Sequence, residues 1–214
     1  MTPASLRIGL LGGTLDPIHV GHLDAAEAAR TALRLDGIVV IPSHDPPHRP
    51  IDPHASPFHR FAMVSLAIDG RPGYRASDME LHRDGPSYTA LTLRDLHAAG
   101  WRPSQLFFII GADAFADISS WFDYPAILDA CQFAVVSRPG LTIEAALART
   151  PDLRARVGGG IHVVNAQTAA VSSTEIRARL AAGGTIEGMV PPPVARHIAV
   201  HQLYRTVDDT HGQD

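Results

Sequence analysis

The sequence predicts an α/β fold: a doubly wound parallel sheet in a single domain. Short apolar runs rich in β-branched residues recur along the chain and end near glycine or proline, which is typical of strands buried on both faces. Segments with helical periodicity separate these runs, so we expect crossover connections between parallel strands. The length of 214 residues supports one substantial core.

The first half of the chain alternates strand and helix patterns. Residues 6–11 form a mostly apolar run before two glycines, which predicts a buried strand. Residues 23–35 are rich in alanine and keep helical periodicity, and residues 38–41 are entirely β-branched, so a helix and a second strand follow. We expect a loop at 43–57, where proline, histidine and aspartate are frequent, and a helix at 58–68.

The second half continues the same alternation. We expect strands at 106–110, 133–136 and 161–164, with a shorter one within 74–81, and helices at 88–98, 173–180 and 193–203. These elements predict a Rossmann-like domain over residues 1–207. Polar residues from 208 to 214 predict a disordered tail.

The composition is that of a soluble globular protein, with 45% hydrophobic and 19% charged residues. A formal net charge of -4 gives no sign of a surface for nucleic acid or membrane, and no apolar run approaches the ~20 residues that span a bilayer. Cys131 is the single cysteine, so no internal disulfide forms and we expect a cytoplasmic protein. The oligomeric state stays open between a monomer and a homodimer.

The chain contains no lysine, since all 18 of its basic residues are arginine. This excludes every mechanism that needs a lysine, including the P-loop lysine and Schiff-base catalysis. Any phosphate chemistry must therefore depend on arginine, histidine, backbone amides and metal ions.

The loop after the first strand has the features of a phosphate site. Gly12 and Gly13 carry no side chains, so backbone amides there can approach a phosphate closely. The helix that begins near Gly21 directs its positive N-terminal end at the same place. His19 and His22 are three residues apart across this turn, so both rings can face the site. A glycine pair alone would indicate only a turn.

A second anion site is expected where the helix at 173–180 begins. Ser172 and Glu175 have the spacing of a capping box, which marks the start of a helix. Ser173, Thr174 and Arg177 add two hydroxyl groups and a guanidinium group to the free amides of the first turn. The plainer interpretation of this segment is a helix cap and nothing more.

Both segments resemble signatures of the nucleotidyltransferase superfamily. Residues 12–22 are similar to its H-x-G-H loop, and residues 171–177 resemble its I-S-S-T-x-I-R motif, with Val171 in place of the first isoleucine. The resemblance implies that His19 and His22 bind the phosphates of a nucleoside triphosphate. It implies three catalytic residues, namely His19, His22 and Arg177.

Further segments resemble bacterial nicotinate-nucleotide adenylyltransferases. Residues 42–49 are similar to that family's P-P-H-K segment, with Arg49 in place of lysine, and residues 87–89 match its S-Y-T turn. The ATP-binding residues that the resemblance implies are Gly12, Gly13, Thr14, Asp16, His19, His22, Arg49, Ser173, Thr174 and Arg177. The residues implied for nicotinate mononucleotide are Thr14, His48, Tyr88, Thr89, Gly111, Asp113, Trp121 and Arg138.

The resemblance implies that ATP and nicotinate mononucleotide react to give deamido-NAD and pyrophosphate, with Mg²⁺ on the ATP phosphates. Three alternatives stay open: a preference for nicotinamide mononucleotide, a phosphopantetheine adenylyltransferase, and a non-catalytic nucleotide-binding module. Asp16 is expected to shape the loop or orient a partner, because a carboxylate repels phosphate. Trp121 could instead belong to the core, and Asp113 could serve only as a helix cap.

The many histidines also raise the question of a metal site. His44, His48, His54 and His59 could bind a transition metal, but the prolines between the first two prevent a helical pair, so we expect no dedicated zinc site. The pair at positions 197 and 201 shares one face of the last helix and is expected to lie on the surface.

Overall fold

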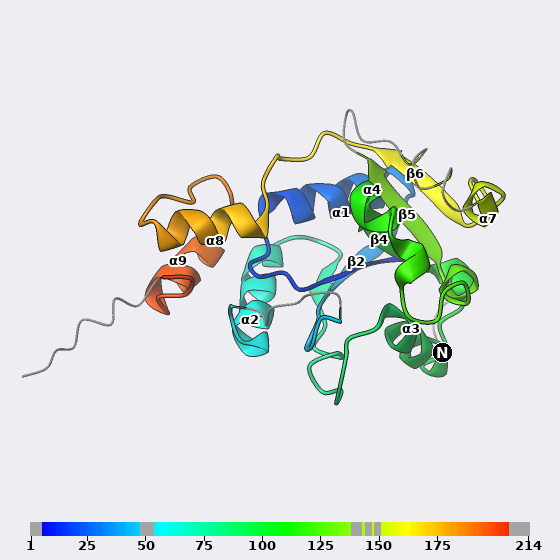
Figure 1. Cartoon of the computed structure of the whole chain (residues 1–214), viewed down its shortest axis with the longest axis horizontal. Coiled ribbons are helices and arrows are strands. Elements are labelled where there is room, and N and C mark those ends of the chain that lie inside the picture. The colour runs from blue at the N-terminus through cyan, green and yellow to red at the C-terminus, as the bar shows by residue number, and fades with distance from the viewer. Residues whose placement is uncertain (1–5, 48–53, 138–142, 144–146, 148–150, 206–214) are drawn as a thin grey trace, which may run out of the picture.

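The computed structural model describes residues 6–47, 54–137, 143, 147 and 151–205. Within these residues, six parallel strands form one sheet in the order β3-β2-β1-β4-β5-β6 (Figure 1). The strands are β1 (Ile8–Gly13), β2 (Gly37–Pro42), β3 (Tyr74–Ala76), β4 (Leu106–Gly111), β5 (Gln132–Ser137) and β6 (Ile161–Asn165). The expected Rossmann-like sheet is therefore confirmed, whereas the tail at 208–214 lies outside the described residues.

Each expected helix is present, with shifted ends. The longer helices are α1 (Val20–Ala32), α2 (Pro57–Ile68), α3 (Thr89–Ala98), α8 (Ser173–Ala181) and α9 (Pro192–Val200). The start expected at residue 23 is wrong by three residues, because the extended backbone of His19 caps α1. None of the described helices is long and apolar enough to cross a membrane.

The sequence patterns missed the shortest helices. These are α4 (Ala112–Phe115), α5 (Ile127–Ala130), α7 (Pro151–Arg154) and the 3₁₀ turns η1 (Pro103–Gln105) and η2 (Ile118–Ser120). A single turn is too short to show helical periodicity, so the pattern that finds the longer helices gives no signal for these.

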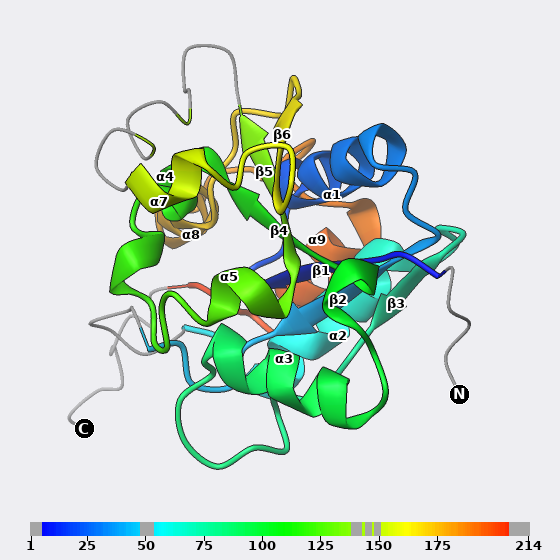
Figure 2. The same ribbon diagram turned by 90° about the vertical axis from the view of Figure 1, so that its right-hand side faces the viewer.

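Helices cover both faces of the sheet (Figure 2). A hydrophobic core lies on each face, as a doubly wound fold requires. Alternate residues of β4 divide between the two cores: Phe107 and Ile109 pack with α1, α2, α8 and α9, whereas Phe108 and Ile110 pack with α3, α4 and α5. Because both faces are covered, the strands lack polar alternation and appear in the sequence as continuous apolar runs.

The strand order places a ligand site at one position of the sheet. The chain leaves β1 toward β2 and β3, and after β3 it returns to build β4, β5 and β6 on the other side of β1. The carboxyl ends of β1 and β4 therefore lie next to each other while their following segments diverge. Such a switch point opens a crevice, and parallel α/β sheets bind their ligands there.

Candidate active site

The loop after β1 is shaped by two glycines. Gly13 has a φ of 152°, which disfavours any residue with a side chain. A Cβ atom on Gly21 would lie 3.1 Å from the carbonyl oxygen of Ala169 and 3.2 Å from Nδ1 of His19. Glycine at position 21 therefore lets the segment before α8 approach the start of α1 closely. Asp24 strengthens this approach, because its Oδ2 accepts a hydrogen bond of 2.9 Å from the Ala169 amide.

The two expected phosphate-binding histidines lie together at the start of α1. The rings of His19 and His22 are stacked, with centroids 3.6 Å apart and planes inclined by 26°. Nδ1 of His22 accepts a hydrogen bond of 3.2 Å from the backbone N–H of His19. A neutral imidazole that accepts at Nδ1 carries its proton on Nε2. His22 therefore has an N–H donor of the kind that a phosphate oxygen requires.

Helix α8 is hydrogen-bonded directly to the loop between β1 and α1. The Ser173 hydroxyl donates to the carbonyl oxygen of Pro17 at 2.9 Å, and Nη1 of Arg177 donates to that of Asp16 at 2.7 Å. Nη2 of Arg177 also donates to Oγ1 of Thr174 at 3.4 Å. The two motifs that lie far apart in the sequence thus form one structural unit.

The cap of α8 differs in part from the expected capping box. Oγ of Ser172 accepts a hydrogen bond of 3.1 Å from the Glu175 amide, as expected. The Glu175 side chain, however, pairs with Arg179 one turn later, at 2.8 Å between Oε1 and Nη2. An ion pair at this spacing competes with the return bond of the box, so only the serine half is formed.

Asp16 lies behind the loop. Its carboxylate is 1% exposed and accepts hydrogen bonds from the backbone amides of His54 and Ala55, at 2.8 and 3.1 Å. The Tyr204 hydroxyl donates a third bond of 2.7 Å. Burial, with the Asp16 charge beside it, raises the pKa of Tyr204, so this hydroxyl stays a donor. The structure thus places Asp16 in the support of the loop.

Arg60 is a site residue that the sequence patterns missed. Its side chain is fully buried and donates to four backbone carbonyl oxygens. The acceptors are Ala55 at 3.1 Å, Thr14 at 2.7 Å, Ser43 at 2.6 Å and His44 at 3.2 Å. One guanidinium group therefore joins the loop after β1 to the loop after β2.

A signal for Arg60 was present in the sequence. The residue lies on the apolar face of α2, at helical spacing from Met63, Val64 and Ala67, all of which are buried. An arginine on a core-facing stripe is costly to bury unless acceptors surround it. The position of Arg60 in the sequence therefore indicated that buried backbone carbonyl oxygens surround its side chain.

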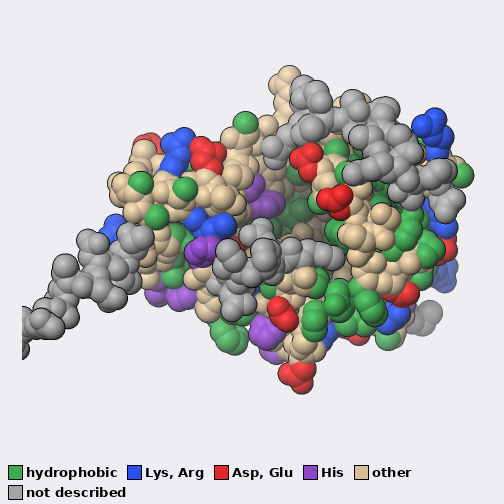
Figure 3. Space-filling model, in the orientation of Figure 1, with side chains coloured by type: hydrophobic (Ala, Val, Ile, Leu, Met, Phe, Trp, Pro, Cys, Tyr) green, Lys and Arg blue, Asp and Glu red, His purple; other side chains and the backbone are tan. Residues whose placement is uncertain are grey.

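One cavity lies at the switch point between β1 and β4, with a volume of about 690 Å³. Histidine side chains lie in the hollow that Figure 3 shows between α8 and α4. Its lining includes most of the expected site residues: Gly12, Gly13, Thr14, His19, His22, Tyr88, Thr89, Gly111, Asp113, Trp121, Ser173 and Thr174. Asp16 and Arg177 are not among the lining residues, and His48, Arg49 and Arg138 lie outside the described residues.

The wall of the cavity opposite α8 begins at α3. Tyr88 is the N-cap residue of this helix. The backbone amides of the first turn, near Thr89, therefore lie at the helix end where N–H groups have no acceptor within the helix. Oγ of Ser87 accepts a hydrogen bond of 2.9 Å from the His44 amide, which fixes this turn against the loop after β2. The Tyr88 ring stacks on Phe122 at a centroid distance of 4.5 Å.

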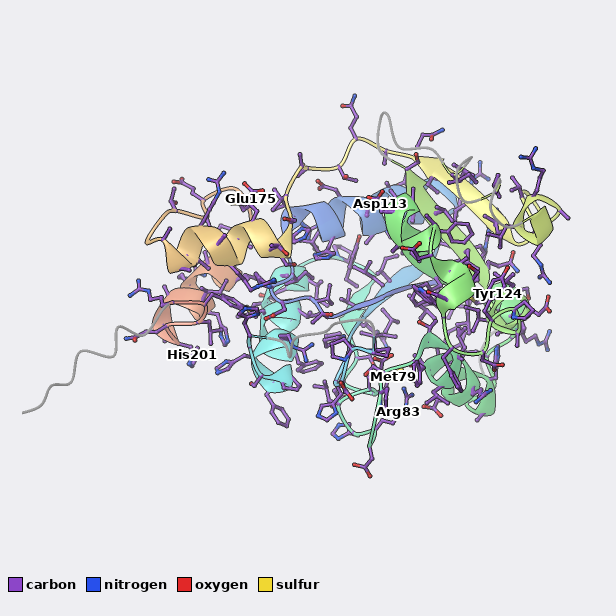
Figure 4. All side chains as sticks on the ribbon, in the orientation of Figure 1. Met79, Arg83, Asp113, Tyr124, Glu175 and His201 are labelled. Atoms are coloured by element: carbon purple, nitrogen blue, oxygen red, sulfur yellow. The ribbon has the colours of Figure 1, made fainter. Side chains whose placement is uncertain are left out.

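The segment after β4 completes the same wall. Gly111 caps α4, and Asp113 in its first turn is exposed and lines the cavity. Figure 4 shows Asp113 at α4, well apart from Glu175 on α8. Trp121 packs edge-on against Phe108, with ring centroids 5.9 Å apart. Since Trp121 also lines the cavity, it borders both the core and the site.

Glu80 lines the cavity and is a second residue that sequence reasoning missed. Its carboxylate is buried and accepts a hydrogen bond from Oγ1 of Thr92. Burial raises the pKa of Glu80, whereas hydrogen bonds from the Thr92 and Ser87 side chains act in the opposite direction. Glu80 follows a strand of only three residues, and a segment with so little pattern gave no reason to single it out.

Comparisons with known proteins agree with this architecture. The cytidylyltransferase-like family model matches residues 10–179. The chain is 43% identical to a protein of Roseiflexus sp. over 94% of this chain and 100% of the relative, and 39% identical to one of Symbiobacterium thermophilum over 96% and 98%. Both relatives are named "Probable nicotinate-nucleotide adenylyltransferase".

Solved structures share the fold at lower identity. Nicotinic acid mononucleotide adenylyltransferase of Plasmodium falciparum complexed with NaAD matches with a TM-score of 0.72 and 19% identity, over 93% of this chain and 97% of that one. The same enzyme complexed with APC matches with a TM-score of 0.70 and 20% identity, over the same shares. At these identities the likeness concerns the fold alone.

Proposed function

This chain belongs to the nicotinate-nucleotide adenylyltransferase family, and we propose that it transfers the adenylyl group of ATP to nicotinate mononucleotide, giving deamido-NAD and pyrophosphate. One observation carries the proposal: the N-terminal ends of α1, α3 and α8 all border a single cavity. A helix N-terminus attracts anions. The two substrates bring three kinds of anionic group, namely a triphosphate, a monophosphate and a carboxylate.

The phosphates of ATP would lie between α1 and α8. Gly12 and Gly13 leave the backbone of the loop open there, and the Nε2–H of His22 would donate to a phosphate oxygen. Ser173 and Thr174, in the first turn of α8, would bind the pyrophosphate end. Arg177 would add positive charge beside this end while it holds the Asp16 carbonyl.

The reaction needs positioning more than proton transfer. The nucleophile is a phosphate oxygen of the mononucleotide, which is already ionised at neutral pH. It attacks the α-phosphorus, the bond from that phosphorus to the bridging oxygen breaks, and pyrophosphate leaves. Catalysis then depends on alignment and on stabilising the negative charge at the α-phosphorus, which is the role proposed for His19 and His22.

The nicotinate group would bind at the opposite wall. Its carboxylate would accept from the amides near Thr89 at the start of α3, and its ring would pack against Trp121. His48 is proposed to bind the mononucleotide and Arg49 to bind ATP, although both lie outside the described residues. A nicotinamide group has no negative charge, so it would gain less from the N-terminus of α3.

Mg²⁺ would enter with the ATP phosphates. This ion prefers phosphate and water oxygens and commonly takes only one or two carboxylates from a protein. The Asp16 carboxylate already accepts three hydrogen bonds, so it does not fit the part of a ligand. Bound Mg²⁺ would neutralise charge on the leaving pyrophosphate, while residues of the loop and of α8 hold the phosphates.

A paired turnover assay tests the proposal. Pyrophosphate release is measured with ATP and Mg²⁺ and either nicotinate or nicotinamide mononucleotide, with ATP alone as the blank. We expect kcat/KM to be about 10- to 10²-fold higher for the nicotinate form, because a charge-assisted hydrogen bond contributes about 1.5–3 kcal/mol. Equal rates would contradict the preference for the carboxylate. Binding of both substrates without pyrophosphate release would contradict adenylyl transfer and favour a binding module.

A further inference from the structure

Three histidines meet outside the cavity, where α2 packs against α9. His59 lies in the first turn of α2, whereas His197 and His201 lie one turn apart at the end of α9. Nδ1 of His59 and Nε2 of His197 are 3.1 Å apart, and one ring nitrogen from each of the three residues lies within 4.8 Å of the others. Figure 4 shows His201 at the lower end of α9.

These distances suit a metal ion of ordinary size. A bond of about 2.0–2.1 Å from zinc to each imidazole nitrogen, in tetrahedral geometry, separates two ligand nitrogens by roughly 3.3 Å. The His59–His197 pair is already close to that separation. His201 is exposed and caps the end of α9, so its side chain has room to move the remaining distance.

The chemistry of the cluster narrows the choice of ion. Three imidazoles suit zinc, copper, nickel or cobalt, whereas magnesium and calcium prefer oxygen ligands. A neutral imidazole ring offers such an ion a lone pair from one of its nitrogens.

We propose that His59, His197 and His201 form a three-histidine site for a transition-metal ion, with zinc as the best match, which joins α2 to α9. A water molecule would complete the tetrahedral coordination, since three protein ligands leave one position open. The site is distinct from the catalytic cavity, because none of the three residues lines it.

The position of the site gives the ion a structural role. Just before α2, the amides of His54 and Ala55 bind the Asp16 carboxylate, and just after α9 the Tyr204 hydroxyl binds the same group. An ion held by His59 and His197 would fix the two segments that together support Asp16. We therefore expect metal binding to stabilise the fold around the phosphate loop without entering the reaction.

The test uses the full chain after removal of metal with a chelator. Zn²⁺ is titrated by calorimetry, and thermal unfolding is followed with and without Zn²⁺ at about 100 times its Kd. We expect one ion per chain and a rise in Tm of about 5–10 °C, as ligand linkage predicts at that excess for a domain of this size. Mg²⁺ at the same concentration serves as the oxygen-preferring control and is expected to leave the Tm unchanged.

Variants then locate the ion. His201→Ala changes an exposed side chain and should leave the fold intact, and His197→Gln replaces the central ligand. Each should lower the Zn²⁺ affinity by about 100-fold or more, since it removes one of three ligands. The matched control is His162→Ala on β6, at the opposite edge of the sheet, which should keep wild-type affinity.

Two results would overturn the proposal. One is a wild-type chain that neither binds Zn²⁺ in the calorimeter nor gains thermal stability from it. The other is Zn²⁺ binding that His201→Ala and His197→Gln leave unchanged, which would place the ion elsewhere among the 12 histidines. Neither result depends on turnover, so the outcome is independent of the proposed reaction.

Discussion

The two sides of the loop that follows β1 differ in what their polar groups bind. On the side that faces the cavity, His19 and His22 stack on each other and stand beside space for a ligand. On the opposite side, Asp16 accepts three hydrogen bonds and Arg60 donates to four carbonyl oxygens, all within the protein. The polar groups of one side border an open cavity, whereas those of the other side hold the loop itself in place.

Because of this difference, neighbouring residues of the loop should affect different properties: the reaction rate on one side and the stability of the fold on the other. Groups of the rear side have their partners in the folded chain, so their loss leaves buried atoms without hydrogen bonds and destabilises the fold. Groups of the cavity side are proposed to act mainly when the transition state forms, so we expect their loss to lower the rate. Substitutions on each side should therefore change different measurements.

Arg60→Met is expected to have the largest effect. The substitution keeps most of the side-chain volume but leaves buried carbonyl oxygens without a donor, so we expect a loss of about 3–5 kcal/mol in the free energy of unfolding. Urea denaturation measures this loss. Arg30→Met is the control, because the partly exposed ion pair of Arg30 with Glu27 should contribute less than about 1 kcal/mol. Equal losses in the two variants would contradict the supporting role of Arg60.

His22→Ala tests the cavity side. Loss of one donor to the developing phosphoryl charge should lower kcat by roughly 10²–10³-fold, measured as pyrophosphate release. The urea midpoint should change far less than for Arg60→Met. His162→Ala is the matched control and should keep normal turnover, since that ring lies on β6 and does not line the cavity. A His22→Ala enzyme with nearly full turnover would remove this ring from the mechanism.

Tyr204→Phe tests a single bond of the rear side. It removes the hydroxyl that donates to the Asp16 carboxylate, and a buried charge-assisted bond contributes about 1.5–3 kcal/mol. The same substitution at Tyr74 removes a bond to Glu27, whose carboxylate is partly exposed, so we expect that variant to lose about 1 kcal/mol or less. Urea denaturation of the Tyr204→Phe and Tyr74→Phe variants measures the two losses in the free energy of unfolding. A larger loss at Tyr74 would contradict the distinction between the two environments.

Glu80→Gln should have the smallest effect, visible as a pH dependence. Burial raises the pKa of Glu80, so the folded state binds its proton more tightly than the unfolded state does. The stability of the wild type relative to Glu80→Gln should therefore fall as the pH rises from about 4.3 through the raised pKa. Denaturation curves at several pH values between about 3 and 7 measure this slope.

Glu27→Gln supplies the opposite sign as a control for that experiment. The hydrogen bond from Arg30 lowers the pKa of Glu27, so its contribution is present above the unfolded pKa and is lost as the pH falls through the folded one. Relative to Glu27→Gln, wild-type stability should rise with pH. Slopes of the same sign in both comparisons would contradict the assignment for Glu80.

The sequence predicted the side of the loop that faces the cavity far better than the side behind it. The spacing of His19 and His22 indicated that these two rings share a site, and the resemblance to the superfamily motifs implied that the start of α8 belongs to it. Arg60 reaches a carbonyl 46 positions away, and the Asp16–Tyr204 bond spans 188 positions. Contacts of this kind depend on how the helices pack, which local periodicity does not encode.

The histidines illustrate the same limit. The four-residue spacing of His197 and His201 correctly predicted a shared helix face, and His201 is exposed as expected. The expectation that no metal cluster forms considered only residues before α2 and at its start. It could not include the packing of α9 against α2, which brings His197 within 3.1 Å of His59.

The bond between Tyr204 and Asp16 also has a consequence for the newly made protein. A chain leaves the ribosome with its N-terminal part first. The loop after β1 therefore emerges long before Tyr204, whose hydroxyl donates to Asp16 in the folded protein. Until α9 and residue 204 follow, the Asp16 carboxylate lacks one of its three donors. A nascent chain or a fragment shortened at that end would carry both histidines of the loop and still be incomplete. We therefore expect the loop after β1 to reach its final structure late in synthesis, when the segment after α9 packs beside it.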